Sequence, residues 1–228
     1  MVLPKALGLA SICLAVGVAA CNPQISGDFY SGDVVDVLET DKPVIVPMRL
    51  GMPIQNEKKC EEHKNKMLPA LERNSNNVKF LNCEDVQGNM YDLMNVEIDA
   101  EIVKGMDVGD GQISGMFGAK VAKDEANRAE IIFVKTPKAA KAIKEIDALY
   151  QFQSIELKGI EIKIRLNNDL RQAAQFVAGS SYVDGRPIDR EASFELKRRA
   201  FIEVVPSNVR SQSLIANGQS LFGVLLLD

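Results

Sequence analysis

The sequence predicts an α+β fold: a mixed or antiparallel sheet with two helices, followed by a small all-β C-terminal portion. Apolar residues alternate with polar or charged ones at 96–102 and 160–166, which is the pattern of half-buried strands. Residues 57–71 and 137–149 instead repeat apolar side chains at helical spacing. Beyond residue 166 we find strand and turn signals but no helical pattern.

The composition is that of an ordinary globular protein. The chain has 228 residues, of which 46% are hydrophobic and 25% charged, so it is long enough to bury a sizeable core. Its 27 Lys and Arg are outnumbered by 31 Asp and Glu, which gives a net charge of −4. A general nucleic-acid binder usually carries a basic excess, and we therefore expect no nucleic-acid partner.

The first twenty residues are typical of a secretory signal peptide. Lys5 supplies a short positive start, and residues 6–20 contain no charged side chain. A helix of fifteen residues is about 22 Å long, which is shorter than the roughly 30 Å hydrocarbon core of a membrane. We therefore expect residues 1–20 to be cleaved rather than to span a membrane.

The end of this segment, Val18-Ala19-Ala20-Cys21, resembles the lipobox of bacterial lipoproteins. The resemblance implies cleavage before Cys21, a thioether-linked lipid on Cys21 and an acylated new N-terminus. It also implies a membrane partner through that lipid and a place in the cell envelope. Asn22 is not the Asp of the enterobacterial inner-membrane sorting rule, which implies the outer membrane, facing the periplasm. The alternative is an ordinary signal peptide that ends near a Cys.

We expect three parts after the signal peptide. Residues 21–28 are predicted to be a short lipidated tether, 29–166 an α+β domain and 167–228 a β-rich portion. The whole chain is similar to uncharacterised proteobacterial lipoproteins, which share a lipobox, a strand flanked by Lys-Pro-Val, one Cys on each side of a helix and an all-β end. That group implies no activity.

The four cysteines have separate expected fates. Cys13 leaves with the signal peptide and Cys21 takes the lipid, which leaves Cys60 and Cys83. An even pair in an oxidising compartment favours a disulfide. The alternative is a metal site shared by Cys60, His63 and Cys83, but structural zinc normally takes four ligands. We therefore expect no metal and no cofactor.

Local signals place the elements along the chain. Asn56 is a predicted N-cap, and Pro69 should kink or end the helix that follows. Thr136 should cap a second helix with Pro137 in its first position. Val183-Asp184-Gly185-Arg186 is a hairpin signal, and residues 112–120 should pair back on the preceding strand. The remaining strands are predicted at 34–38, 43–50, 78–83, 90–103, 130–135, 155–166, 194–205 and 221–227.

His63, the only histidine, lies in a charged segment and is expected on the surface, so we predict no catalytic residues. Residues 107–111 resemble a fragment of a calcium loop without its remaining ligands, which favours a glycine-rich hairpin. An acidic ladder on one strand face is expected to be solvated, because paired catalytic carboxylates usually lie on facing elements. The ladder consists of Glu97, Asp99 and Glu101.

Two basic sets are also expected on the surface. Lys138, Lys141 and Lys144 recur every three residues along one predicted helix, and near a membrane this basic face could contact lipid phosphates. The alternative is an ordinary solvated helix face. Residues 197–199, Lys-Arg-Arg, lie inside a predicted strand, where charge deters edge-to-edge aggregation.

These observations favour a non-enzymatic cell-envelope lipoprotein that binds another envelope protein. It would act as an accessory factor or as a surface-exclusion factor that masks a receptor. The alternative is a periplasmic enzyme or a solute- or glycan-binding lipoprotein. The sequence leaves the oligomeric state open.

Overall fold

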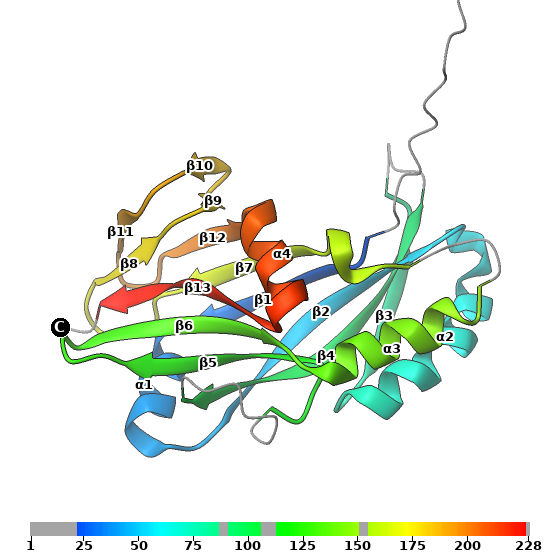
Figure 1. Ribbon diagram of the computed structural model, residues 1–228, viewed down its shortest axis with the longest axis horizontal. Helices are drawn as coiled ribbons and strands as arrows, with labels where there is room; N and C mark the ends of the chain where they lie inside the picture. The colour runs from blue at the N-terminus through cyan, green and yellow to red at the C-terminus, as the bar shows by residue number, and fades with distance from the viewer. Residues whose placement is uncertain (1–21, 87–90, 106–112, 151–154, 227–228) are drawn as a thin grey trace, which may run out of the picture.

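The computed structural model describes residues 22–86, 91–105, 113–150 and 155–226. Within this part of the chain, a single mixed sheet of thirteen strands curls into a nearly closed barrel (Figure 1). The predicted mixture of helix and strand is confirmed, but the described residues form four α-helices rather than two. They are α1 (Ser31–Thr40), α2 (Cys60–Asn74), α3 (Pro137–Asp147) and α4 (Asn208–Asn217).

Strands from the last part of the chain flank those from the first part on both sides of the sheet. The order is β10-β9-β12-β7-β1-β2-β4-β5-β6-β13-β8-β11, with β3 paired to β4. Residues of the predicted β-rich portion thus join the main sheet, because β12 pairs with β7 and β13 with β6. The strands are β1 (Gln24–Tyr30), β2 (Val44–Ile54), β3 (Lys79–Glu84), β4 (Asp92–Lys104), β5 (Phe117–Lys123), β6 (Arg128–Lys135), β7 (Glu161–Asn167), β8 (Ala174–Ala178), β9 (Ser181–Val183), β10 (Arg186–Ile188), β11 (Ala192–Leu196), β12 (Phe201–Pro206) and β13 (Gln219–Leu226).

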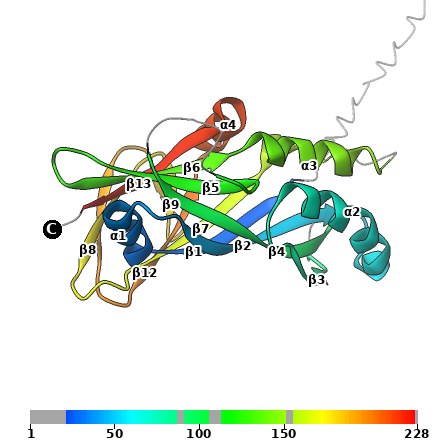
Figure 2. The ribbon, with the colours of Figure 1, turned by 90° about the horizontal axis from the view of Figure 1, so that it is seen from below.

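Three of the helices lie at the two ends of the barrel, and α4 packs beside β13. Figure 2 shows α1 at the opposite end from α2 and α3, which pack against each other. The core fills the space between them with side chains from the inward positions of the strands, such as Met48, Ile98 and Ile164. These positions alternate with outward polar ones, as the period-2 patterns predict.

Strand β1 corrects the prediction of a tether at residues 21–28. Residues 24–28 form most of a strand that pairs with β2 on one side and with β7 on the other. Ile25 and Phe29 point into the core and are almost completely buried. Two buried apolar residues among Gly, Ser and Asp gave too weak a pattern to predict a strand. The described fold therefore starts immediately after Cys21.

Helix α1 corrects the prediction of a strand at 34–38. Val34, Val37 and Leu38 lie at helical spacing and are buried in the core. Packing of this apolar face outweighs the strand preference of the β-branched valines. The helix ends at Asp41, whose left-handed backbone lets its N–H donate to the carbonyl of Val37.

Helix α2 begins close to the predicted position. The side chain of Asn56 accepts a hydrogen bond from the backbone N–H of Lys58, in a 3₁₀ turn that leads into the helix, so the predicted cap is confirmed. Pro69 does not end the helix, which continues to Asn74. The buried side chains Met67, Ala70 and Leu71 lie on both sides of this proline, and their packing holds the helix together.

Two details around β5 and α3 differ from the predictions. Strand β5 pairs with β4 in parallel, so the predicted hairpin at 112–120 is wrong. Helix α3 has Pro137 in its first turn as predicted, but Thr136 does not cap it with its side chain. The Thr136 hydroxyl instead donates to the carbonyl of Gly115 at 2.8 Å, which ties the start of α3 to the segment before β5.

The C-terminal region contains the predicted hairpin and an unpredicted helix. Val183 pairs with Arg186 across a turn in which Asp184 and Gly185 have positive φ. Residues 194–205 form parts of two strands, not one, and residues 197–199 lie in the turn between them. Helix α4 follows this region, with the Ser207 side chain accepting a hydrogen bond from the N–H of Arg210. Its apolar face is too short to have been predicted.

Asn168 joins three segments of this region. Its side-chain Nδ2 donates to the carbonyl of Leu196 at 2.7 Å and to that of Gln172 at 2.9 Å. Its Oδ1 accepts from the N–H of Leu170 at 3.0 Å. The residue is 1% exposed, so these bonds replace water that it would otherwise bind.

Candidate functional site

A groove follows strand β1 along the outside of the sheet, and we call it the outer groove. Its first half has a volume of about 680 Å³ and its second half about 670 Å³. The two halves share Ser26, Arg49 and Lys163, which come from the adjacent strands β1, β2 and β7. The outer groove is therefore one continuous surface, whose first half starts at Asn22.

The floor and walls of the outer groove come from different parts of the chain. Outward positions of β1 and the bare backbone at Gly51 form the floor. The end of β3 at Glu84 forms one wall, whereas Lys158 and the α4 residue Ser211 form the other. Alternation along the strands turns these polar residues outward while the residues between them pack in the core.

Charged residues in the outer groove are arranged in pairs of opposite sign. Arg49 and Glu84 form an ion pair between β2 and β3. Lys163 Nζ lies 3.6 Å from the carboxylate of Glu203. The guanidinium of Arg165 lies 3.7 Å from the Asp28 carboxylate. All these side chains are at least one-third exposed, and such pairs stabilise a fold very little, so they can exchange partners with a ligand at low cost.

Beside its charged pairs, the second half of the outer groove carries exposed apolar side chains. Tyr30, Ile45 and Leu81 line it and are 42%, 51% and 38% exposed. Nearby, the Arg165 guanidinium lies 4.6 Å from the ring centre of Phe201, which is 53% exposed. Aromatic residues and arginine are enriched in protein interfaces. The arrangement is therefore suited to binding a polypeptide.

Asn95 holds the β3 wall in place from below. This β4 residue is 1% exposed, and its Nδ2 donates to Asn82 Oδ1 at 2.9 Å and to Glu84 Oε2 at 3.2 Å. Glu84 thus accepts from Asn95 and pairs with Arg49 at the same time. These bonds orient the half-exposed Glu84 carboxylate beside Arg49.

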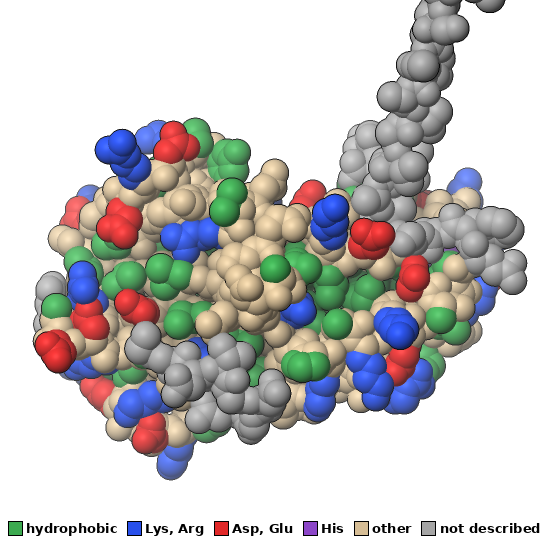
Figure 3. All heavy atoms as spheres, in the orientation of Figure 1, with side chains coloured by type: hydrophobic (Ala, Val, Ile, Leu, Met, Phe, Trp, Pro, Cys, Tyr) green, Lys and Arg blue, Asp and Glu red, His purple; other side chains and the backbone are tan. Residues whose placement is uncertain are grey.

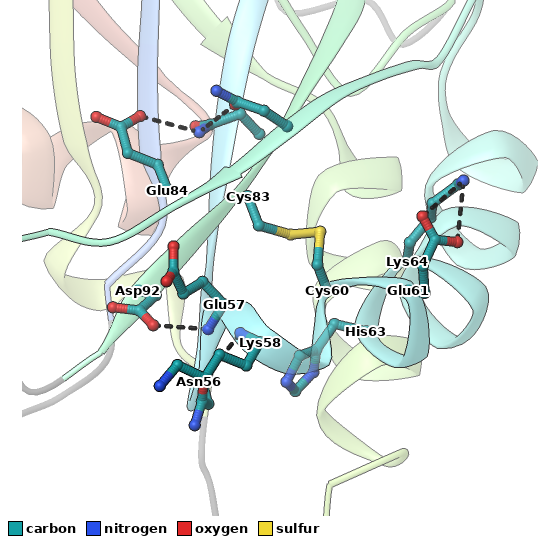
Figure 4. Close-up of a disulfide and its surroundings, with 12 residues drawn as sticks. Asn56, Glu57, Lys58, Cys60, Glu61, His63, Lys64, Cys83, Glu84 and Asp92 are labelled. Atoms are coloured by element: carbon teal, nitrogen blue, oxygen red, sulfur yellow. Dashed lines mark hydrogen bonds and ion pairs between the residues drawn. A yellow bond between two sulfur atoms is a disulfide. The ribbon is translucent and has the colours of Figure 1, made fainter.

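The predicted disulfide between Cys60 and Cys83 is present and joins α2 to β3 (Figure 4). Cys83 directly precedes Glu84, so the disulfide fixes the strand that forms the groove wall. Both sulfur atoms are used in this bond and cannot act as thiolate ligands. In the described part of the chain no cluster of three or more His, Cys, Asp or Glu could hold a metal ion.

His63 corrects the prediction of a surface histidine. It lies one turn after Cys60 in α2 and is only 4% exposed (Figure 4). Its Nδ1 lies 2.8 Å from the Tyr150 hydroxyl, and the two rings stack with their centres 5.7 Å apart. Its Nε2 has no hydrogen-bond partner among the described residues. The sequence missed this because Tyr150, which covers the ring, follows α3 far along the chain.

Burial lowers the pKa of His63 from its ordinary 6.5, while Glu62 raises it and Lys66 and Lys59 lower it further. Burial also disfavours the charged form of Tyr150 and raises its pKa to about 12, with Glu62 adding to the rise. The unfolded chain therefore takes up a proton on His63 at a higher pH than the folded chain does. The contribution of neutral His63 to the free energy of unfolding should therefore be fully present above pH 6.5 and should fall as the pH drops below that value.

We expect the free energy of unfolding in urea to be lower at about pH 5.5 than at about pH 7.5. His63→Gln should remove most of this difference, since the chain contains no other histidine. The comparison is between the changes in unfolding free energy with pH in the two proteins. A loss of stability that is the same at both pH values does not affect it. An unchanged slope in the variant would assign the pH dependence to other groups.

The structure gives each member of the predicted acidic ladder a local partner. Glu97 lies 3.7 Å from Lys79 Nζ, and Asp99 accepts a hydrogen bond from Asn77. Glu101 accepts from the backbone N–H of Ser114 at 2.7 Å. These contacts indicate that the three carboxylates have a structural role on the outer side of β4.

The predicted basic face lies on α3, where Lys138, Lys141 and Lys144 are exposed. Figure 3 shows basic side chains gathered over this helix. Lys138 Nζ donates to the carbonyl of Ser114 at 2.7 Å. Glu145, whose pKa is lowered chiefly by its hydrogen bond with Arg73 and also by Lys141, adds a negative charge beside the face. Cys21 and residues 107–111 lie outside the described residues.

One protein family, described as "Domain of unknown function (DUF7424)", matches residues 24–227. The chain belongs to the DUF7424 family. The DUF7424 match begins at the first residue of β1 and includes every described strand. No curated protein and no solved structure matches the chain. Within the described part of the DUF7424 domain, we find no helix with the length and apolar character needed to cross a membrane.

Proposed function

We propose that this protein is a lipid-anchored, non-enzymatic component of the bacterial cell envelope that binds another envelope protein through the outer groove. The composition of the groove carries the proposal. Arg49 and Arg165 lie with exposed aromatic and aliphatic side chains on one surface, together with exchangeable ion pairs. Protein interfaces combine these features. An accessory role or masking of a receptor would both use such a surface.

The lipobox supports attachment through Cys21, and Asn22, which is not the Asp of the inner-membrane sorting rule, supports the outer membrane, facing the periplasm. We expect Cys21→Ala to abolish incorporation of labelled fatty acid and to release the protein from the membrane fraction. The matched control is Cys13→Ala, which should leave both unchanged because Cys13 lies within the predicted signal peptide. Continued lipid labelling of Cys21→Ala would exclude this anchor.

We further propose that the α3 basic face rests on anionic lipid once the anchor is in place. Each lysine near an anionic surface contributes about 1 kcal/mol. Lys138→Glu with Lys141→Glu should therefore weaken binding of the delipidated protein to vesicles containing phosphatidylglycerol by at least about tenfold. Lys42→Glu with Lys123→Glu makes the same change of charge elsewhere and should have little effect. Equal vesicle binding by the α3 variant and the control variant would contradict this proposal.

The partner-binding role is tested by crosslinking in intact cells and recovery of the lipidated protein from membranes. One protein recovered in a fixed ratio supports the proposal. The volume of the first half of the groove also lies within the range of small-molecule sites, which keeps a solute- or glycan-binding role as the second candidate. Thermal stabilisation by a periplasmic solute or a cell-wall fragment, without a protein partner, would favour that role.

A further inference from the structure

We infer that the outer groove holds an extended, membrane-proximal segment of its partner polypeptide, lying alongside β1. The inference rests on the proposed function, because it takes Cys21 as the anchor and a protein as the partner. To the proposed function it adds the extended shape of the bound segment, the distance of that segment from the bilayer and the order of the chemical groups along it.

The position of the groove follows from where the fold begins. Asn22 comes directly after Cys21 and lines the first half of the groove, and β1 starts at Gln24. One residue spans at most about 3.6 Å, so this half lies next to a lipid carried by Cys21. The seven residues of β1 extend the groove by about 23 Å from that point. A polypeptide in the groove is therefore next to the membrane at the Cys21 end, and its other end is at most about 23 Å further away.

The first half of the groove favours polypeptide over lipid. Its lining carries Glu84 and Glu161 as well as Arg49, Lys158 and Lys163. The two carboxylates weaken the attraction of this lining for anionic lipid headgroups, compared with a purely basic site. A polypeptide can present both signs of charge, with a carboxylate opposite Arg49 or Lys163 and a cation opposite Glu161.

The same lining disfavours a glycan. Protein sites for sugars commonly stack an aromatic ring against the sugar face, and none of the described residues that line the first half is aromatic. The polar side chains and backbone groups there suit hydrogen bonding to a peptide instead. Ser26 and Gln24 lie along it at outward positions of β1.

The second half of the groove gives the segment a direction. Tyr30 and Ile45 form an exposed apolar lining at the end away from Cys21, and Leu81 adds an exposed apolar side chain on the β3 wall, level with Ile25. Apolar anchors in such positions supply much of the binding energy in protein interfaces. The bound segment should therefore be polar and charged along its length and carry an apolar side chain at the end further from the membrane.

Photocrosslinking in living cells tests this inference on the full-length lipidated protein. A photoreactive benzoylphenylalanine replaces Leu81 at one wall, Ser211 at the other, or Glu125 as a control in the β5–β6 turn. We expect adducts from the two groove positions, mapped by mass spectrometry to a partner segment within about ten residues of its own membrane attachment. The yield from Glu125 should be at least tenfold lower.

Charge reversal in the groove provides the matched comparison. Arg49→Glu with Lys163→Glu should lower the adduct yield from Ser211 at least tenfold, whereas Lys42→Glu with Lys123→Glu should leave it unchanged. Adducts to lipid or glycan, adducts to a distant part of the partner, or an unchanged yield in the groove variant would overturn the inference. A polypeptide adduct from Glu125 alone would overturn the groove assignment and leave partner binding intact. No polypeptide adduct from any position would count against the proposed function itself.

Discussion

Replacing Cys60 and Cys83 together by serine is expected to lower the free energy of unfolding by about 3 kcal/mol. The disulfide closes a loop with a sequence separation of 23 residues, and the chain-entropy model gives roughly this value for a loop of that length. The loss should be larger than that of a typical surface substitution because the bond joins α2 to a strand with only one strand partner, β4, among the described residues.

Urea denaturation with and without reductant measures this effect. The wild-type protein should lose stability on reduction, and the double variant, Cys60→Ser with Cys83→Ser, should not respond to reductant at all. Before reduction, Cys60 and Cys83 should resist alkylation in protein taken from the periplasm. Two free thiols at that stage, or a loss below about 1 kcal/mol in the double variant, would contradict the expected role.

The second large effect is expected for Asn168→Ala, at about 3 kcal/mol of unfolding free energy. The change removes three hydrogen bonds and leaves the buried carbonyl of Leu196 without its side-chain donor. Each lost bond costs about 1 kcal/mol, and an unsatisfied buried group adds to the cost.

Asn167→Ala is the matched control for this change. Asn167 is the neighbouring residue, but its side chain is less buried and its Nδ2 donates to the Asp28 carboxylate at 3.0 Å. We expect a loss below about 1 kcal/mol, measured in the same urea titrations. Equal losses for the two variants would show that the buried position of Asn168 adds nothing.

Local signals predicted much of the secondary structure. The hairpin at Asp184-Gly185, the cap at Asn56 and the proline at the start of α3 each depend on residues close together in the chain, and all three are present. The disulfide was predicted from the number of cysteines and the expected compartment. With only Cys60 and Cys83 left to pair, the prediction needed no knowledge of how α2 and β3 pack.

The elements that were missed depend on distant partners. Strand β1 has only two strongly buried apolar side chains, and it is held by β2 and by β7, which lies far along the chain. Val34 and Val37 have a strand preference that packing against the barrel end outweighs. Such contacts cannot be derived from the spacing of residues within one segment.

The outer groove was missed for a related reason. Lys163 and Arg165 alternate with buried isoleucine and leucine side chains, as charged residues do on any half-solvated strand. Their position beside Arg49 and Tyr30 depends on the order β7-β1-β2, which no local pattern specifies. A prediction of this site would have needed the pairing of β1 with both neighbours.

The place of β1 between β2 and β7 also constrains the order of folding. Gln24 pairs with Glu161 in parallel, so the first strand must wait for a partner 137 residues later in the chain. During synthesis or export, β1 can form a hairpin-like pair with β2 early, but its other edge stays open until β7 has emerged. Long-range pairing of this kind slows folding and leaves strand edges exposed to wrong partners. The N-terminal strand is thus among the earliest parts of the body to emerge and among the last to be completed.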